Sequence, residues 1–203
     1  EVYKKYHPEV LRLFLISSHY RSPIDFSEKN LEDATKVLSR FYEGLAGVQE
    51  KIGSLDSASI PDFSKKVKDH PLTQKFEAAM NDDLNTAVAM ALMNEELRKL
   101  NTAVQIKNSD NLGKLAVAVT AWKDAGKILG IFCLTPAEFE KELFEIKNSN
   151  LGLDVEKIEK LIADRQSARQ SKNWAEADRC RDDLIEMGVL IEDTPTGTEW
   201  KLK

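Results

Sequence analysis

The distribution of apolar residues along the chain predicts a mostly helical protein. Only nine glycines and six prolines interrupt 203 residues, and long segments place apolar side chains three or four positions apart, which is the spacing of one helix face. A helix that begins after Ser27 is the clearest case, because serine suits an N-cap and Phe26 can pack on Leu31. Gly44 and Gly47 predict the end of this helix. Its apolar stripe consists of Leu31, Ala34, Leu38, Phe41 and Leu45.

Further helices are indicated on both sides of this one. A short helix begins at Pro8, and another covers residues 72–80 before a break at the sequence NDDLNT. Residues 47–71 are rich in serine, glycine and proline, which predicts a flexible connection with a short helix around Phe63 and Val67. Two later stripes indicate long helices. They are Met90, Met93, Leu97, Leu100 and Val104, and then Leu112, Leu115, Val119, Trp122 and Leu129.

The sequence TPAE, residues 135–138, is a start signal for a short last helix. Threonine can cap it, proline suits the first helical position, and the glutamate stands three residues after the cap. These segments together predict an antiparallel helical bundle. The sequence KNSNLGL, residues 147–153, then predicts a domain boundary.

A small α+β domain with two helices and a β-hairpin is predicted after that boundary. Its first helix presents one apolar face, whereas Asn173 can cap the second helix and Gly188 can end it. The sequences VLIED and TEWKL, separated by TPTG, predict two strands joined by a longer turn. The apolar face of the first helix consists of Val155, Ile158, Leu161 and Ile162.

Composition excludes several classes of protein. No apolar run approaches the roughly 18 residues of a membrane span, and no signal peptide is evident, so we expect a soluble, cytoplasmic protein without a membrane partner. Cys133 and Cys180 lie far apart and outside any C-x-x-C pair, which argues against a disulfide framework and a cysteine-rich zinc site. Glycine-rich phosphate-binding motifs are missing from the sequence as well.

The histidines and the paired aspartates have structural interpretations. His7, His19 and His70 show no spacing typical of a nucleophilic triad or a metal site. The motif NDDLNT lies where one helix ends and the next begins, so its polar side chains are expected to satisfy free backbone N–H groups. It also lacks the spaced oxygen ligands of a calcium loop. The sequence therefore predicts no catalytic residue, no cofactor and no metal in this chain.

The distribution of charged residues along the sequence indicates one segment that could bind RNA. The formal net charge is -5, the wrong sign for binding nucleic acid through the whole surface. Between residues 165 and 181 the sum turns positive, because four arginines and one lysine outnumber two acids. Single-stranded RNA is read by stacking on aromatic or arginine planes and by hydrogen bonds to base edges. The residues that could supply this chemistry are Arg169, Trp174, Asp178 and Asp193.

The two C-terminal tryptophans differ in what the pattern predicts. Trp174 opens a helix, where it has few core neighbours, so exposed recognition and simple packing are equally open for it. Trp200 alternates with Thr198 and Leu202 along a strand, and we expect it to pack in the core.

Three stretches of the chain resemble bacterial cysteinyl-tRNA synthetases. They are EVYKKYHPEVLRLFLISSHYRSPIDFSEKNLEDA, MNDDLNT and the closing KNWAEADRCRDDLIEMGVLIEDTPTGTEW. The resemblance covers essentially the whole chain and implies the C-terminal part of such an enzyme. Residues 1–26 would end the stem-contact region after the catalytic domain, residues 27–150 would form a DALR-type anticodon-binding bundle, and residues 154–203 a small anticodon-recognition domain.

The resemblance also implies roles for single residues. Arg169, Trp174, Asp178 and Asp193 fall on the family's recognition positions and are expected to contact anticodon bases. Arg165 and Lys172 are expected to hold the tRNA backbone. The implied partners are tRNA(Cys) with a GCA anticodon and the chain's own N-terminal catalytic domain, and we expect a monomer.

The catalytic motifs of that family do not occur in this sequence. HIGH, KMSKS and the cysteine and histidine zinc ligands are missing, so ATP and zinc are expected only in the catalytic domain, and this chain alone should be inactive. A second hypothesis follows from the acidic net charge: a helical protein–protein interaction module without RNA contact.

Overall fold

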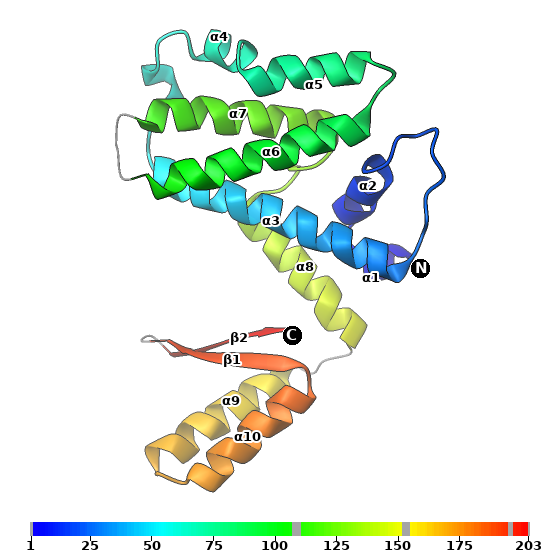
Figure 1. The fold of residues 1–203 in the computed structure, drawn as a ribbon. Helices are drawn as coiled ribbons and strands as arrows, with labels where there is room; N and C mark the ends of the chain where they lie inside the picture. The colour runs from blue at the N-terminus through cyan, green and yellow to red at the C-terminus, as the bar shows by residue number, and fades with distance from the viewer. Residues whose placement is uncertain (1, 107–110, 152–154, 195–196, 203) are drawn as a thin grey trace. The chain divides into compact units, whose positions relative to one another are not determined.

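The computed structural model describes residues 2–106, 111–151, 155–194 and 197–202, which are mainly helical, as predicted (Figure 1). Contacts divide the chain into two compact units, and we call Tyr6–Lys141 the bundle unit and Glu1–Lys5 with Glu142–Lys203 the tail unit. In the described part the elements are α1 Val2–Lys5, α2 Pro8–Ile16, α3 Glu28–Ile52, the 3-10 turn η1 Ser57–Ser59, α4 Phe63–Lys68, α5 Pro71–Asn81, α6 Thr86–Gln105, α7 Leu112–Ile128, α8 Pro136–Leu151, α9 Val155–Gln170, α10 Trp174–Glu186, β1 Val189–Thr194 and β2 Gly197–Leu202.

Aromatic rings form the centre of the bundle unit. Trp122 on α7 and Phe41 on α3 are fully buried, with ring centroids 5.3 Å apart, and Phe132 lies 4.6 Å from Trp122. The Trp122 indole Nε1 donates a hydrogen bond of 3.0 Å to the Met93 carbonyl on α6. The stripes that the sequence predicted on these helices therefore meet in one core.

Helix α3 is longer than its glycines predicted. Ser27 caps it as expected, since its hydroxyl accepts the N–H of Asn30 at 3.3 Å. The helix runs past Gly44 to Ile52, and Gly53, whose φ is 59°, is its C-cap. A Cβ at Gly44 would collide with the side chain of Leu97 on α6. The prediction that Gly44 ends the helix was wrong because this glycine allows two helices to pack closely.

Helix α8 also extends beyond its prediction. Its start is the expected capping box: the backbone N–H and hydroxyl of Thr135 donate to Glu138 Oε2 at 2.8 Å, and the Glu138 N–H donates to Thr135 Oγ1 at 3.3 Å. The helix then continues to Leu151, so it is not short, and residues 147–151 are helical. The remaining residues of the KNSNLGL segment, 152–153, lie outside the described residues.

All three histidines of the chain accept a backbone hydrogen bond. Nδ1 of His7, His19 and His70 accepts the N–H two positions further on, at 3.2, 3.3 and 3.3 Å. His7 and His70 thereby cap α2 and α5, each directly before a proline at the first helical position. These local contacts support the structural interpretation of the histidines.

The tail unit has a small core of its own. Ile158 of α9, Leu184 of α10 and Val189 of β1 are buried together. Trp200 is partly buried against this cluster, and its ring centroid lies 5.2 Å from that of Phe144, in agreement with the expected packing. The other side chains against the cluster are Leu161, Ile162, Met187 and Ile191.

The two strands form the predicted antiparallel hairpin. The register pairs Val189 with Leu202 and Thr194 with Gly197. Both strands therefore reach into the TPTG segment, and the prediction of a longer turn was wrong.

Candidate nucleic-acid interface

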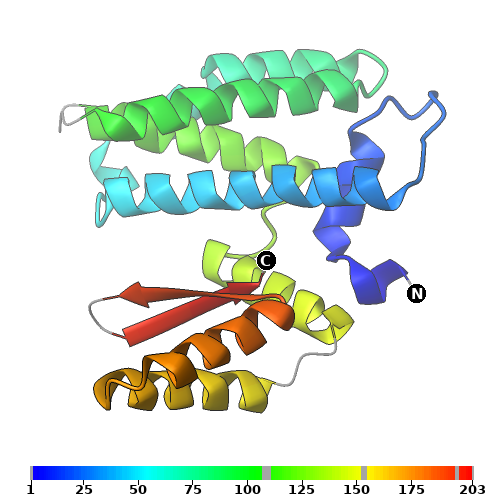
Figure 2. The ribbon, with the colours of Figure 1, turned by 60° about the horizontal axis from the view of Figure 1, so that its bottom comes forward.

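A tight turn that joins α9 to α10 carries the locally basic segment. The two helices lie side by side in both views (Figures 1 and 2). The Asn173 N–H donates to the Ala168 carbonyl at 2.8 Å, and the Lys172 N–H donates to the Arg169 carbonyl at 3.1 Å. These are the two hydrogen bonds of a Schellman motif. Lys172 occupies its left-handed position, with φ 58°, where glycine is the usual residue.

The first turn of α10 presents an aromatic ring to solvent. Trp174 is 60% exposed, so it does not pack in the core. Asp178 is also exposed and lies four positions further along the helix, so it belongs to the same face. A stacking surface and a hydrogen-bond acceptor are therefore neighbours at the start of α10.

Basic side chains flank this tryptophan. Arg169 in the last turn of α9 and Lys172 in the connecting turn are exposed, whereas Arg165, one turn earlier on α9, is half-buried. The positive sum along the sequence is reduced by an ion pair, because Arg179 Nη2 lies 2.7 Å from Glu176 Oε1. Arg179 therefore has a carboxylate partner on its own helix.

Asn173 caps α10 as the sequence predicted. Its Oδ1 accepts the N–H of Glu176 at 3.4 Å, at the weak end of hydrogen-bond geometry. The Glu176 carboxylate accepts a hydrogen bond from Arg179 Nη2 at 2.7 Å.

Asp193 is placed by its backbone alone. It pairs with Thr198 in the hairpin, and its side chain lies outside the described part of the structure. The described side chains thus bring Arg169, Lys172, Trp174 and Asp178 to one end of the helix pair. The sequence did not predict the left-handed backbone conformation of Lys172, because the residue at this position is not a glycine.

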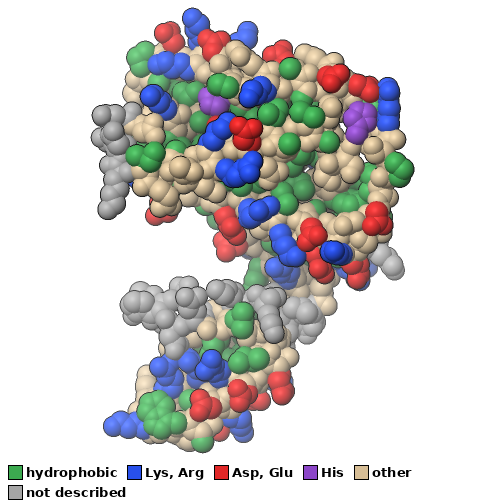
Figure 3. Space-filling view, in the orientation of Figure 1, with side chains coloured by type: hydrophobic (Ala, Val, Ile, Leu, Met, Phe, Trp, Pro, Cys, Tyr) green, Lys and Arg blue, Asp and Glu red, His purple; other side chains and the backbone are tan. Residues whose placement is uncertain are grey.

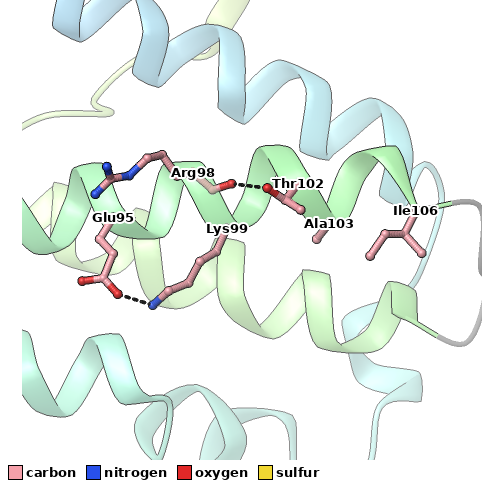
Figure 4. A pocket seen from close by; sticks show the side chains of 6 residues that line it. All are labelled: Glu95, Arg98, Lys99, Thr102, Ala103 and Ile106. Carbon is pink, nitrogen blue, oxygen red and sulfur yellow. Dashed lines mark hydrogen bonds and ion pairs between the residues drawn. The ribbon is translucent and has the colours of Figure 1, made fainter.

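A charged pocket of about 460 Å³ also lies along α6 of the bundle unit (Figure 4). Lys99 Nζ lies 2.9 Å from Glu95 Oε1 and 3.3 Å from Glu96 Oε2, and the hydrogen bond that Lys99 donates to Glu95 is the largest cause that raises the pKa of Lys99. Two carboxylates therefore already pair with this lysine. The pocket is lined by Glu95, Arg98, Lys99, Thr102, Ala103 and Ile106.

The two thiols and the metal-ligating side-chain types are the remaining groups to consider among the described residues. Burial raises the pKa of the Cys133 and Cys180 thiols, which leaves less of the reactive thiolate. Within the described ranges, no three His, Cys, Asp or Glu side chains are grouped so that they could hold a metal ion. None of the helices in those ranges has the length and apolar character needed to cross a bilayer.

One family match falls in each unit of the chain. Residues 75–133 match the DALR domain, and residues 155–200 match the cysteinyl-tRNA ligase anticodon binding domain. The second match contains Arg165, Arg169, Lys172, Trp174, Asp178 and Asp193.

Curated relatives align with the whole chain. A cysteine–tRNA ligase of Geobacter metallireducens is 38% identical over 207 residues, which cover 100% of this chain and 43% of the relative. A cysteine–tRNA ligase of Pseudomonas paraeruginosa is 42% identical over 202 residues, with 100% and 39% covered. The chain therefore spans about two fifths of the length of the relatives that it matches, and it corresponds to their C-terminal part.

Proposed function

We propose, because this chain belongs to the cysteine–tRNA ligase family, that it is the part of such an enzyme that binds tRNA(Cys) and reads its GCA anticodon. The complete ligase would attach cysteine to tRNA with ATP. In this proposal residues 1–26 end the stem-contact region, residues 27–150 are the anticodon-binding bundle, and residues 154–203 recognise the anticodon. The reaction itself, with ATP and zinc, would belong to the N-terminal catalytic domain of the longer protein, a cytoplasmic monomer.

The exposed Trp174 carries this proposal. A large aromatic side chain that is 60% exposed at the start of a helix can stack on an unpaired base. Asp178 on the same face can accept hydrogen bonds from a base edge, and Arg169 can donate them. Asp193 is the fourth proposed base contact, on its position in the family's pattern.

Phosphate contacts would complete the interface. Lys172 stands at the connecting turn and Arg165 one helical turn from Arg169, so both can follow an RNA backbone while the bases meet α10. Contacts of this kind fix the register of the RNA but carry no sequence information. The second hypothesis, a protein–protein interaction module, is not favoured, because the tail matches an anticodon binding domain.

Binding to tRNA tests the proposal. The affinity of the chain is measured for tRNA carrying GCA and for the same tRNA with its first anticodon base changed, at one fixed salt concentration. We expect a loss of about 1 to 3 kcal/mol for the changed base, the usual value for one mismatched contact. Equal affinities would exclude base reading by this tail, and no binding to either tRNA would exclude the chain as the tRNA-binding part.

A further inference from the structure

An apolar surface lies where the α2–α3 connection meets the α5–α6 turn. Six of the twelve large hydrophobic side chains that are exposed in the described part of the chain belong to these elements and their flanking helix ends. Figure 3 shows hydrophobic side chains at this end of the bundle unit. A concentration of this kind typically marks an interface. We call it the connection patch: Leu15, Tyr20, Ile24, Phe26, Leu84 and Val88.

Hydrogen bonds tie the two segments of the patch together. Tyr20 Oη donates to Asp83 Oδ1 at 2.8 Å, and Arg21 Nη2 donates to the same oxygen at 3.1 Å. Thr86 Oγ1 donates to the Ser18 carbonyl at 3.4 Å. Segments more than sixty residues apart in the sequence are thereby held as one surface.

The turn at the centre of the patch has an unfavourable backbone conformation. Asp83 and Leu84 have φ values of 56° and 52°, in the left-handed region that glycine and asparagine adopt more readily. Leu84 nevertheless carries an apolar side chain that is 58% exposed. Strained residues persist where the surrounding structure holds them, and they are frequent at functional surfaces.

The composition of the patch favours a protein partner over RNA. An RNA surface is dominated by cations that meet phosphates. Segments 17–27 and 82–88 contain one arginine and no lysine, and that arginine, Arg21, pairs with Asp83 at 3.1 Å. The exposed apolar side chains of these segments can form the apolar centre of a protein–protein contact.

We propose that the connection patch docks the N-terminal part of the longer ligase, the part that these 203 residues do not include. The proposal rests on the proposed function, since it takes the chain as one part of a ligase. The relatives indicate which protein segment could cover the patch. This chain covers only 39 to 43% of their length, so more than half of such a protein lies outside this chain and is available to pack against it.

Hydrogen exchange on the full-length ligase and on the 203-residue chain tests the docking. We expect peptides covering residues 18–26 and 82–88 to exchange about tenfold more slowly in the full-length protein, because docking removes local opening. Equal rates in the two proteins would overturn the proposal. Protection that appears only after tRNA is added would overturn it too and would assign the patch to RNA.

A matched pair of variants separates docking from folding. Leu84→Asn removes the apolar side chain but suits the left-handed backbone, so the chain should fold at least as well. In the full-length protein it should raise the exchange of both peptides toward that of the separate chain. Ile128→Asn changes a side chain that is 68% exposed on α7, outside the patch, and should leave both peptides unchanged.

The same two variants distinguish this proposal from the proposed function. Docking predicts that Leu84→Asn leaves the discrimination between the GCA and changed anticodons intact. If the wild-type chain does not discriminate, the proposed function fails while the exchange result still stands. If Leu84→Asn and Ile128→Asn alter exchange equally, docking at the patch fails while anticodon reading still stands.

Discussion

Two tryptophans distinguish the two units of this protein. Trp122 of the bundle unit is fully buried, with its indole N–H bonded to the Met93 carbonyl at 3.0 Å. Trp174 of the tail unit is 60% exposed at the start of a helix. The first has its apolar ring and its polar group satisfied inside the protein, whereas the second presents its ring to solvent. The same residue type thus stabilises one unit and is available to bind a ligand on the other.

Two carboxylates, one in each unit, show the same difference between a buried and an exposed side chain. Glu9 of the bundle unit is 6% exposed and accepts hydrogen bonds from Tyr42 Oη at 2.8 Å and from the N–H groups of Phe132 and Cys133 at 3.2 and 3.0 Å. Asp178 of the tail unit is exposed. Burial therefore separates side chains that hold the fold from side chains that can bind, and substitutions can test this separation.

Trp122→Ala should have the largest effect on stability. It removes a buried aromatic side chain from a packed core, which typically costs about 3 to 5 kcal/mol. Urea unfolding followed by circular dichroism measures the loss. The folded fraction of the variant should still discriminate between anticodons, and a selective loss of that discrimination would contradict the assignment of this tryptophan to the core.

Glu9→Gln should destabilise the protein by about 2 kcal/mol, because an amide nitrogen would then oppose a backbone N–H that the carboxylate now accepts. The matched change, Asp178→Asn, should alter stability by less than about 0.5 kcal/mol, as is usual at the surface. Thermal unfolding of both variants makes the comparison. Similar losses at the two positions would show that the exposed carboxylate also supports the fold.

The outline of these units could be predicted from the sequence because it depends on local rules. Helix starts at Ser27, Thr135 and Asn173 follow from hydrogen bonds within one turn. The end of α3 was missed because the role of Gly44 depends on Leu97, a residue on another helix, and no local rule contains that contact.

The site was only partly predictable for the same reason. The charge pattern and the family resemblance led to residues 165–178, but neither could decide whether Trp174 is buried, since that depends on how α9 and α10 pack. The left-handed conformation of Lys172 was not predictable either, because lysine rarely adopts it.

Trp174→Ala should weaken tRNA binding by about 1 to 3 kcal/mol, the usual contribution of a base stacked on an aromatic ring. Its stability should change by less than about 0.5 kcal/mol, because an exposed ring contributes little to the core. Filter binding and thermal unfolding on the same preparation measure both. Trp200→Phe is the control, since it perturbs a partly buried ring and should lower stability while the folded protein keeps its affinity.

Lys172→Gly should have the smallest effect and should change stability and affinity in opposite directions. Glycine suits φ 58°, so the variant should gain roughly 0.5 to 1 kcal/mol of stability. Loss of the cation should weaken binding to tRNAs with either anticodon alike and reduce the slope of log affinity against log salt by about 1. Lys172→Ala removes the charge without suiting the backbone, so it should show the same binding loss and no gain in stability. If glycine raises stability but leaves the salt slope at the wild-type value, Lys172 is a strained turn residue without a phosphate partner, and Arg165 is the remaining proposed backbone contact.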